Sequence, residues 1–444
     1  MGVDEWDAVN LRDVCFKIGS GATPRGGQNV YLSKGEYTLI RSQNIYNEGF
    51  SQDGLVFLTK RHAEELSNVE VQKGDVLLNI TGDSVARCCQ VDERVLPARV
   101  NQHVSIIRSD SNKLDSCFLR YFLISLPMQS LMLSWAGSGG TRNALTKGMI
   151  EAFEVPCPPI AEQKAIAHIL GTLDDKIELN QQMNQTLEAI ARALFKSWFI
   201  DFDPVRAKLD GRQPIGMDAE TAALFPAEFE DSALGEIPKG WKIQTSESIF
   251  SVKDGTHDSP KVAEAGYPLV TSRHLKKGYI DFDNTYLISE DDFHEVNKRS
   301  KVDKNDVLIT MIGTVGNLLF IDYEEVNFAI KNVGLFKTSE KPELSEYFYF
   351  YLRSDKIENY LKIRQAGTTQ SYITLKTLRT IPVLLPSSEL VRLFSKSVTP
   401  QLQKITATRE ESHLLVSIRD ALLPKLLSGE IRVQDAETVV EAVT

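Results

Sequence analysis

The sequence predicts an α+β protein in which two similar globular domains alternate with two long helices that pair as an antiparallel coiled coil. Two observations support this fold class. The chain repeats one pattern of residues at a nearly constant offset, and the spacing of apolar residues changes from about two to about three and a half after each copy. At 444 residues the chain also exceeds what one ordinary hydrophobic core organises. We therefore expect an internal pseudo-two-fold repeat.

The repeat is clearest where KGDVLLNITGDSVA (residues 73–86) recurs as KNDVLITMIGTVG (residues 304–316). Each segment reaches a glycine, Gly82 or Gly313, seven residues after its aspartate. Neighbouring segments match at offsets of 228 to 230, and from Lys176 to the end of the first helix the match has no gap. These matches indicate two copies of one structural plan.

The two copies divide the chain into successive parts. Each predicted domain mixes short β-rich runs with glycine, asparagine and aspartate turns and a helix, which indicates a compact α+β fold. The segment after each domain carries apolar residues at alternating steps of four and three, which is typical of a coiled-coil seam. The predicted parts are a domain at 1–157, a spacer helix at 158–200, a connector at 201–238, a domain at 239–386, a second spacer helix at 387–432 and a tail at 433–444.

Both predicted helices have polar residues at the centre of an otherwise apolar seam. Asn180 and Asn184 occupy this position in the first helix, and Thr408 and Ser412 occupy it in the second. Polar residues in such a seam fix register and orientation at a cost in stability. Antiparallel pairing would bring these four side chains together and would carry the two domains to opposite ends of the helix pair.

Two segments lack long periodicity. Residues 201–238 are acidic and rich in proline and glycine, so we expect a mostly irregular connector. The residues after Val433 are expected to form a frayed acidic tail.

Composition and charge narrow the classes of protein. Hydrophobic residues make up 42% and charged residues 25%, and no apolar run approaches the ~18 residues of a membrane helix. The polar N-terminal sequence does not read as a signal peptide, and the five cysteines lack paired spacing, so we expect a cytoplasmic protein with reduced thiols. The net charge of −10 is concentrated in residues 158–238, which hold 14 acidic and 7 basic residues. Near-neutral domains permit a basic, DNA-facing surface on either one.

No catalytic constellation is recognisable. GSGGTRNA (137–144) lacks both the lysine of a phosphate-binding loop and the glycine spacing of a dinucleotide site. The seven histidines form no H-x-x-x-H pair, and DFDPV (201–205) lacks the second proline and the aromatic residue of the Asp-Pro-Pro-Tyr methyltransferase motif. Two unlike domains at a fixed separation would suit two unlike half-sites of a DNA duplex. The alternatives are a tandem binding scaffold for a non-DNA ligand, and a nuclease or methyltransferase with unrecognised motifs.

Three motifs connect the chain with a known family. They are the segments 156–205, which begins PCPPIAEQ, 235–242 (GEIPKGWK) and 417–431 (SIRDALLPKLLSGEI). Over essentially its full length the chain resembles the specificity subunit of type I restriction–modification systems. Its second helix departs from the pattern, because SSELVRLF (387–394) stands where PPIAEQKAI is expected.

The resemblance implies a non-catalytic subunit with two target recognition domains, each binding one half of a split double-stranded DNA site. It implies two methyltransferase subunits, which use AdoMet, and restriction subunits, which use ATP and Mg²⁺, as partners. In this chain itself we expect no cofactor, no metal and no contact with a membrane.

Candidate contact residues are polar side chains expected on loops, because arginine, lysine, amide and hydroxyl groups read base edges. For DNA they are Thr23, Arg25, Arg41, Gln43, Asn44, Arg87, Arg142, Asn143, Thr256, His257, Arg273, His274, Lys331, Asn332, Gln370 and Tyr372. Large apolar groups at the end of a long helix need cover, so a second set is predicted to dock a partner protein, with packing against their own domain as the alternative. This set is Trp198, Phe199, Phe202 and Pro204.

Overall fold

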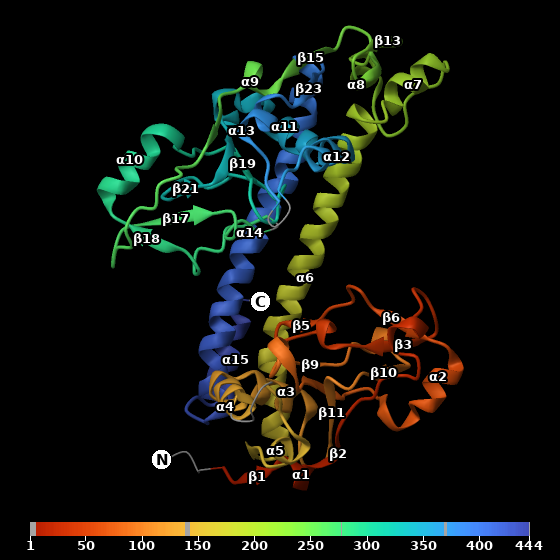
Figure 1. The fold of residues 1–444 in the computed structure, drawn as a ribbon, viewed down its shortest axis with the longest axis vertical. Helices are drawn as coiled ribbons and strands as arrows, with labels where there is room; N and C mark the ends of the chain where they lie inside the picture. The colour runs from red at the N-terminus through yellow and green to blue at the C-terminus, as the bar shows by residue number, and fades with distance from the viewer. Residues whose placement is uncertain (1–5, 138–142, 277, 368–370, 444) are drawn as a thin grey trace. The chain divides into compact units, whose positions relative to one another are not determined.

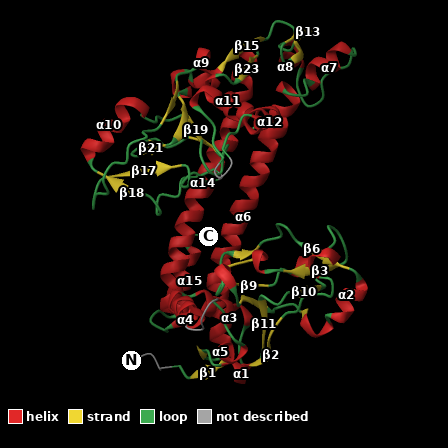
Figure 2. Cartoon of the chain, viewed as in Figure 1, coloured by secondary structure: helices red, strands yellow, loops and turns green. Residues whose placement is uncertain are grey.

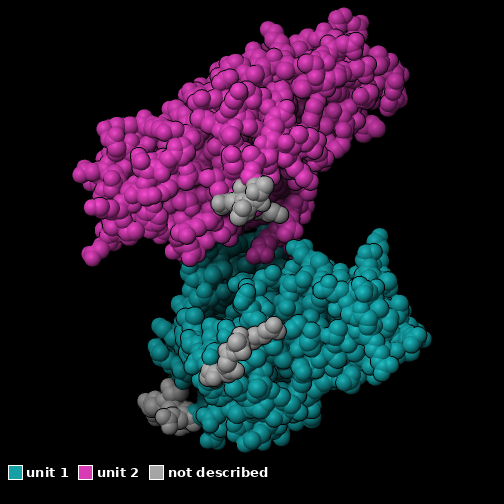
Figure 3. Space-filling view, viewed as in Figure 1, with its two compact units in different colours: residues 1–180, 410–444 teal, residues 181–409 magenta. Residues whose placement is uncertain are grey.

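The computed structural model describes residues 6–137, 143–276, 278–367 and 371–443 (Figure 1). It separates into two compact units, one formed by residues 1–180 with 410–444 and the other by residues 181–409 (Figure 3). Each unit contains one globular domain. The two long helices, α6 (Ile160–Phe199) and α14 (Ser388–Leu427), each contribute one part to either unit.

The first domain consists of two small sheets with helices packed around them (Figure 2). One sheet has the strand order β2–β11–β8–β9, and the other has the order β6–β3–β10–β7 with β3 and β10 parallel. The pair β1–β12 joins the start of the domain to its end, and β4–β5 forms a hairpin. The elements are β1 (Ala8–Asn10), α1 (Leu11–Val14), β2 (Cys15–Ser20), β3 (Tyr37–Ile40), β4 (Ile45–Tyr46), β5 (Gly49–Phe50), β6 (Val56–Leu58), α2 (Lys60–Glu65), β7 (Glu70–Val71), β8 (Val76–Asn79), β9 (Cys88–Gln90), β10 (Ala98–Val100), β11 (Val104–Ser109), α3 (Ser116–Ile124), α4 (Leu126–Gly137), α5 (Lys147–Glu151) and β12 (Glu154–Pro156).

The second domain repeats this topology. Its sheets have the orders β16–β22–β19–β20 and β18–β17–β21, with β17 and β21 parallel, and β15 pairs with β23 as β1 pairs with β12. The elements are β15 (Lys242–Thr245), α9 (Ser246–Ile249), β16 (Val252–Asp254), β17 (Tyr267–Thr271), β18 (Tyr286–Ile288), α10 (Glu290–Ser300), β19 (Val307–Thr310), β20 (Leu318–Phe320), β21 (Ala329–Lys331), β22 (Val333–Phe336), α11 (Ser345–Leu352), α12 (Asp355–Ile363), α13 (Leu375–Arg379) and β23 (Pro382–Leu385). The predicted fold class and its internal repeat are therefore confirmed.

The repeated KGD and KND segments form the same turn before β8 and β19. Asp75 and Asp306 are fully buried, and the main-chain amide three residues earlier donates to each carboxylate at 2.7 Å. Each carboxylate also pairs with a cation, Arg108 at 2.7 Å in the first domain and Lys337 at 2.5 Å in the second. Because a buried carboxylate without such partners is strongly unfavourable, the aspartate explains why this segment repeats.

The long helices pack against each other with opposite chain directions. In the first unit Asp174 of α6 binds Arg419 of α14 at 2.8 Å and Arg120 of α3 at 2.8 Å. Burial raises the pKa of the Asp174 carboxyl, but the charges of Arg120 and Arg419 outweigh burial and hold that pKa below its ordinary value. In the second unit Phe195 of α6 packs against Phe394 of α14, with ring centroids 5.5 Å apart.

The polar residues of the seam meet as the antiparallel register predicts. Within the first unit the Asn180 amide donates to Glu411 at 2.8 Å and to Ser412 at 3.3 Å. Within the second unit the Thr408 hydroxyl donates to Asn184. The apolar seam residues on either side of these contacts are mostly buried. The coiled-coil register predicted from the sequence is therefore confirmed.

The PPIAEQ motif anchors the start of α6 to the first domain. Gln163 is fully buried, accepts the Asp115 amide at 2.9 Å, and donates to the carbonyls of Lys113 at 3.0 Å and Pro158 at 2.8 Å. At the repeat offset, α14 has the buried apolar residue Val391. The two long helices therefore begin in different ways, which gives a structural basis for the departure of SSELVRLF from the motif.

Two expectations about irregular segments were wrong. The connector contains α7 (Asp203–Leu209), α8 (Ala219–Ala223) and the hairpin β13 (Phe229–Ser232)–β14 (Gly235–Pro238), because its aromatic residues bury themselves in the second unit. The segment expected to be a frayed tail forms α15 (Val433–Glu441), with Ala436 and Val440 buried in the first unit. Apolar residues four apart outweigh the acidic composition there.

Across the part of the chain that the structure describes, no single helix is long and apolar enough to cross a membrane. The pair α3 and α4, bent by 69°, meets the criteria of length and composition only when both helices are taken together.

We expect Asp75→Ala to destabilise the first domain by roughly 2–4 kcal/mol, since it leaves the Arg108 guanidinium and a main-chain amide without their buried partner. Chemical denaturation of the full chain measures the change. A matched control is Glu93→Ala, which removes the exposed pair Lys73–Glu93 and should cost less than about 1 kcal/mol. Equal effects of the two substitutions would contradict the structural role of Asp75.

Candidate nucleic-acid interface

In the first domain the segment after β2 crosses from one sheet to the other and lies on the connection between β10 and β11. The Gly21 amide donates to the Val104 carbonyl at 2.9 Å, and the Ala22 amide donates to the Val100 carbonyl at 3.1 Å. A side chain at Gly21 would place its Cβ 2.1 Å from the Val100 oxygen, so only glycine permits this approach. The contact brings Thr23 beside Gln102.

A row of hydrogen-bonded polar side chains runs across these segments. Thr23 donates to the Gln102 amide oxygen, and the Gln102 amide nitrogen donates to His103 Nε2 at 2.8 Å. Since this leaves the ring proton on Nδ1, His103 donates to the Thr81 hydroxyl at 2.6 Å. The row joins three separate loops. Its amide, imidazole and hydroxyl groups suit hydrogen bonding to base edges.

The second domain builds the same crossing with different side chains. The Gly255 amide donates to the Val333 carbonyl at 2.9 Å, the next amide donates to the Ile330 carbonyl at 3.1 Å, and a Cβ at Gly255 would lie 2.4 Å from the Ile330 oxygen. The polar groups here carry charge. His257 lies 2.8 Å from the Asn332 side-chain oxygen and 3.1 Å from Asp254 Oδ2.

Two cationic side chains extend this second row. Lys331 donates to the Ser259 hydroxyl, and Arg299 of α10 pairs with Asp254. Equivalent scaffold positions in the two domains therefore present chemically unlike groups, uncharged in the first domain and largely ionic in the second. Two such surfaces are suited to different sets of donors and acceptors.

Asn44 and His274 form the buried side of the same turn in the two domains, and their prediction as contact residues was wrong. Asn44 accepts the Arg41 amide at 3.0 Å and donates to two carbonyls at 3.0 Å, and His274 Nδ1 accepts the Thr271 amide at 3.1 Å. Their exposed fractions are 0% and 1%. These buried, hydrogen-bonded side chains stabilise the turn and are not accessible to a ligand.

The remaining candidates occupy the loops around these crossings. Thr23, Arg25, Gln43, Asn143, His257, Arg273 and Tyr372 are exposed, whereas Arg41, Arg87, Lys331 and Asn332 are half-buried. Arg41 already donates to the Gly54 carbonyl at 2.6 Å. Thr256 is 9% exposed, and its hydroxyl accepts the Asp258 amide at 3.1 Å, so its role is local. Arg142 and Gln370 lie outside the described residues.

The loops that contain Asn143 and Tyr372 dock in the same way in both domains. The Gly82 amide donates to the Asn143 carbonyl at 3.2 Å, and the Gly313 amide donates to the Ser371 carbonyl at 3.0 Å. The candidates Asn143 and Tyr372 therefore lie next to the loop after β8 and the loop after β19.

Sequence reasoning missed six residues of these rows: Thr81, Gln102, His103, Asp254, Ser259 and Arg299. A signal for Gln102 was present. The candidates Lys331 and Asn332 match Asn101 and Gln102 at the repeat offset of 230. Applying this offset to the second-domain candidates identifies the connection between β10 and β11 in the first domain.

The residues predicted to dock a partner lie in the core of the second unit. Trp198, Phe199 and Phe202 are 7%, 1% and 9% exposed, and Pro204 is also buried. Trp198 packs on Phe225 with ring centroids 5.3 Å apart. No large apolar surface is left on these side chains for a partner to cover, so the alternative of packing against their own unit describes them.

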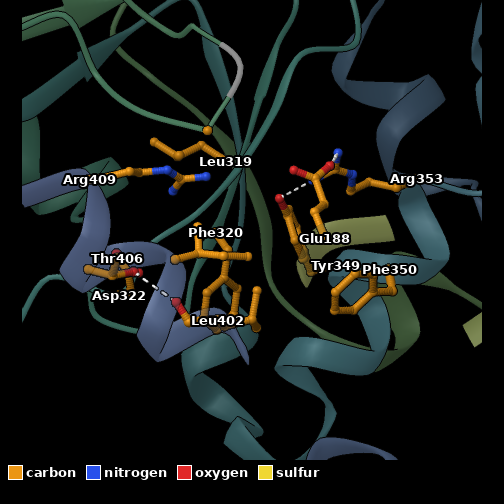
Figure 4. Close-up of a pocket in the computed structure, with 12 residues that line it drawn as sticks. Glu188, Leu319, Phe320, Asp322, Tyr349, Phe350, Arg353, Leu402, Thr406 and Arg409 are labelled. Carbon is orange, nitrogen blue, oxygen red and sulfur yellow. Dashed lines mark hydrogen bonds and ion pairs between the residues drawn. The ribbon is translucent and has the colours of Figure 1, made fainter. Parts of the chain in front are cut away.

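A narrow pocket lies in the second unit between its domain and the long helices (Figure 4). Its polar groups are largely paired with one another, since Arg353 binds Glu188 and Thr406 binds Asp322. Burial, and then the charge of Arg409, lower the pKa of Arg353 to about 10, which leaves it protonated at neutral pH. The described residues include no group of three histidines, cysteines or carboxylates placed to hold a metal ion. This arrangement favours a structural role for the pocket.

A repeated scaffold that carries two unlike polar surfaces defines a two-domain recognition protein. The chain belongs to the family of type I restriction–modification DNA specificity domains, whose model matches residues 3–189 and 238–402. This membership confirms the prediction of a specificity subunit and weighs against both the non-DNA scaffold and the unrecognised enzyme.

Relatives agree with this assignment over almost the full chain. The chain is 29% identical to the HindI specificity subunit of Haemophilus influenzae, covering 87% of this chain and 95% of that protein. It is 27% identical to the MjaIX specificity subunit of Methanocaldococcus jannaschii, covering 97% and 94%. The crystal structure of the type I S subunit from M. genitalium shares the fold with a TM-score of 0.56, at 17% identity and with 96% and 97% of the two chains covered.

We expect His274→Asn, which introduces the residue of the equivalent first-domain turn, to reduce the loss of stability in acid. Burial, and next the charge of Arg273, lower the pKa of His274 below its ordinary 6.5. At a pH below about 6.5 the His274 ring is therefore protonated more fully in the unfolded chain than in the folded chain. The free energy of unfolding is highest above about pH 6.5 and falls as the pH drops below that value. Denaturation of the full chain at pH 8 and pH 5.5 measures the difference.

In this experiment the exposed His294→Asn is the control, and it should behave like the unsubstituted chain. A His274→Asn variant that loses as much stability in acid as the unsubstituted chain would show that the buried ring accepts a proton in the folded state.

Proposed function

We propose that this chain is the DNA-reading subunit of a type I restriction–modification complex, and that each of its domains reads one half of a split double-stranded site. The observation that supports this most strongly is the repeated crossing at Gly21 and Gly255. An identical backbone device holds unlike side chains in the two domains. A scaffold of this kind suits a protein whose task is to distinguish two different half-sites.

The proposed contact surface of each domain is centred on the connection between its parallel-paired strand and the next strand. In the first domain this connection carries Gln102 and His103, and in the second it carries Asn332, with Lys331 at the end of β21. Neutral amide and imidazole groups discriminate bases through their hydrogen-bond pattern. Lysine adds charge, which contributes to affinity through the phosphates as well. The two half-sites should therefore differ in sequence, which makes the whole site asymmetric.

The proposed partners are two methyltransferase subunits, which supply AdoMet chemistry, and restriction subunits, which supply ATP- and Mg²⁺-dependent chemistry. This chain would contribute recognition and spacing. The docking of the methyltransferases is assigned to the exposed faces of α6 and α14, because the buried residues at the end of α6 do not offer an apolar surface. The near match of the two helices at an offset of 228 supports two equivalent docking sites.

A map of adenine methylation in the native host, with the gene intact and with it deleted, tests this function. We expect one interrupted, asymmetric motif to lose methylation on deletion and to regain it on complementation. An unchanged map, together with no methyltransferase recovered on the tagged chain, would contradict the proposal.

The proposed stoichiometry has its own test. Native mass spectrometry of the complex purified through this chain should give one copy of the chain with two methyltransferase subunits. One methyltransferase per chain would overturn the claim of two equivalent docking sites and leave the DNA-reading role intact.

A further inference from the structure

The turn that ends at Arg87 is held rigidly by the first domain. It follows β8, and Ala86 within it has a φ of +73°, which is uncommon for a residue with a side chain. The Ala86 amide donates to the Asn79 carbonyl at 2.9 Å, and the Asn79 amide donates to the Arg87 carbonyl at 2.8 Å. Asn79 itself is fully buried and donates from its side chain to the Ser42 carbonyl at 2.9 Å. The backbone of Arg87 is therefore fixed relative to the neighbouring turn.

The Arg87 side chain is also held, but its donor groups are not used. The guanidinium carbon lies 5.0 Å from the ring centroid of Tyr46, a distance typical of a cation–π contact. Among the residues that the structure describes, its guanidinium has no hydrogen bond and no ion pair, whereas Arg41 and Arg108 bond to carbonyl or carboxylate groups. Stacking on an aromatic ring orients a guanidinium and leaves its hydrogen-bond donors in the plane free. Arg87 is thus oriented in advance for a ligand.

The second domain contains the same turn without the arginine. The Gly316 amide donates to the Thr310 carbonyl at 3.1 Å, and the Thr310 amide donates to the Asn317 carbonyl at 2.9 Å, which makes Asn317 the equivalent of Arg87. The side-chain amide of Asn317 donates to the Leu275 carbonyl at 3.4 Å. The same backbone thus carries a free guanidinium in one domain and an internally bonded amide in the other.

We propose that Arg87 is a specificity-determining residue that reads a guanine in the half-site of the first domain, with Tyr46 as its positioning residue. This inference rests on the proposed function. A planar guanidinium donates two hydrogen bonds to guanine O6 and N7, a pattern that the other bases do not offer in the major groove. Because Asn317 replaces the arginine, the half-site of the second domain lacks this requirement.

An arginine that only neutralised a phosphate would behave differently under substitution. Lysine retains the charge and satisfies a phosphate, but it does not reproduce the two-bond geometry to guanine. The substitution Arg87→Lys therefore separates the two roles. Arg87→Asn is a second variant that introduces the residue this turn already accommodates in the second domain.

The experiment maps adenine methylation in the host after chromosomal replacement of this gene by each variant. For Arg87→Lys and Arg87→Asn we expect one guanine in one half of the motif to become degenerate, with a roughly 10- to 100-fold fall in preference for guanine there. The other half should stay unchanged. Tyr46→Leu should loosen the same position to a smaller extent. The control is Arg212→Lys, an exposed connector arginine paired with Asp210, which should leave the motif unchanged.

Several outcomes would overturn the inference. They are an unchanged motif with Arg87→Asn, relaxation in both halves, and a uniform loss of binding across a panel of oligonucleotides by a purified complex that remains assembled. The last result would identify a phosphate contact. If the unsubstituted gene supports no split motif, the proposed function itself fails, and this result is distinct from any change confined to the variants.

Discussion

The proposed recognition surface of each domain depends on one close approach of two backbones. In the first domain the segment after β2 crosses the connection between β10 and β11, and in the second domain the segment after β16 crosses the connection between β21 and β22. A glycine lies at each point of contact. At Gly21 and at Gly255 a Cβ would lie 2.1 Å and 2.4 Å from a carbonyl oxygen, well inside van der Waals distance. Without glycine the crossing segment would have to move away, and the polar rows on Gln102 and on Asn332 would lose their partners.

The periodic features of the chain were the most predictable from sequence. The coiled-coil register follows from apolar residues at steps of four and three, and the contacts of Asn180 and Asn184 follow from antiparallel pairing alone. The repeated aspartate was visible as a motif, although its reason, a buried ion pair that closes a turn, appears only when Arg108 and Lys337 are seen beside it. The prediction from composition was wrong where burial of a few apolar side chains determines the structure. The acidic tail forms a helix because Ala436 and Val440, four residues apart, are buried in the core of the first unit.

The candidate site was predictable only in outline. Residue type shows that a side chain can form hydrogen bonds to a base. It does not show whether that side chain already forms hydrogen bonds within the protein. Asn44 and His274 have suitable chemistry but form the hydrogen bonds of their own turns, whereas the Arg87 guanidinium has no hydrogen bond to the residues that the structure describes. The two kinds of residue are separated by main-chain hydrogen bonds from distant loops, which one sequence does not encode in any short window. The internal repeat carries part of the missing information, since an element seen clearly in one domain locates its counterpart in the other.

The two domains illustrate how one fold supports different specificities at little cost to its stability. Buried groups that hold the scaffold, such as the aspartate pairs, are alike in charge and geometry in both copies. Groups that differ, such as Arg87 and Asn317, lie on turns whose main-chain hydrogen bonds match in the two domains. Exchange of the Arg87 side chain leaves the main-chain hydrogen bonds of its turn in place, so its energetic effect falls mainly on the ligand. Recognition can therefore change at one position while the glycine crossing, the aspartate turn and the helix register remain as they are.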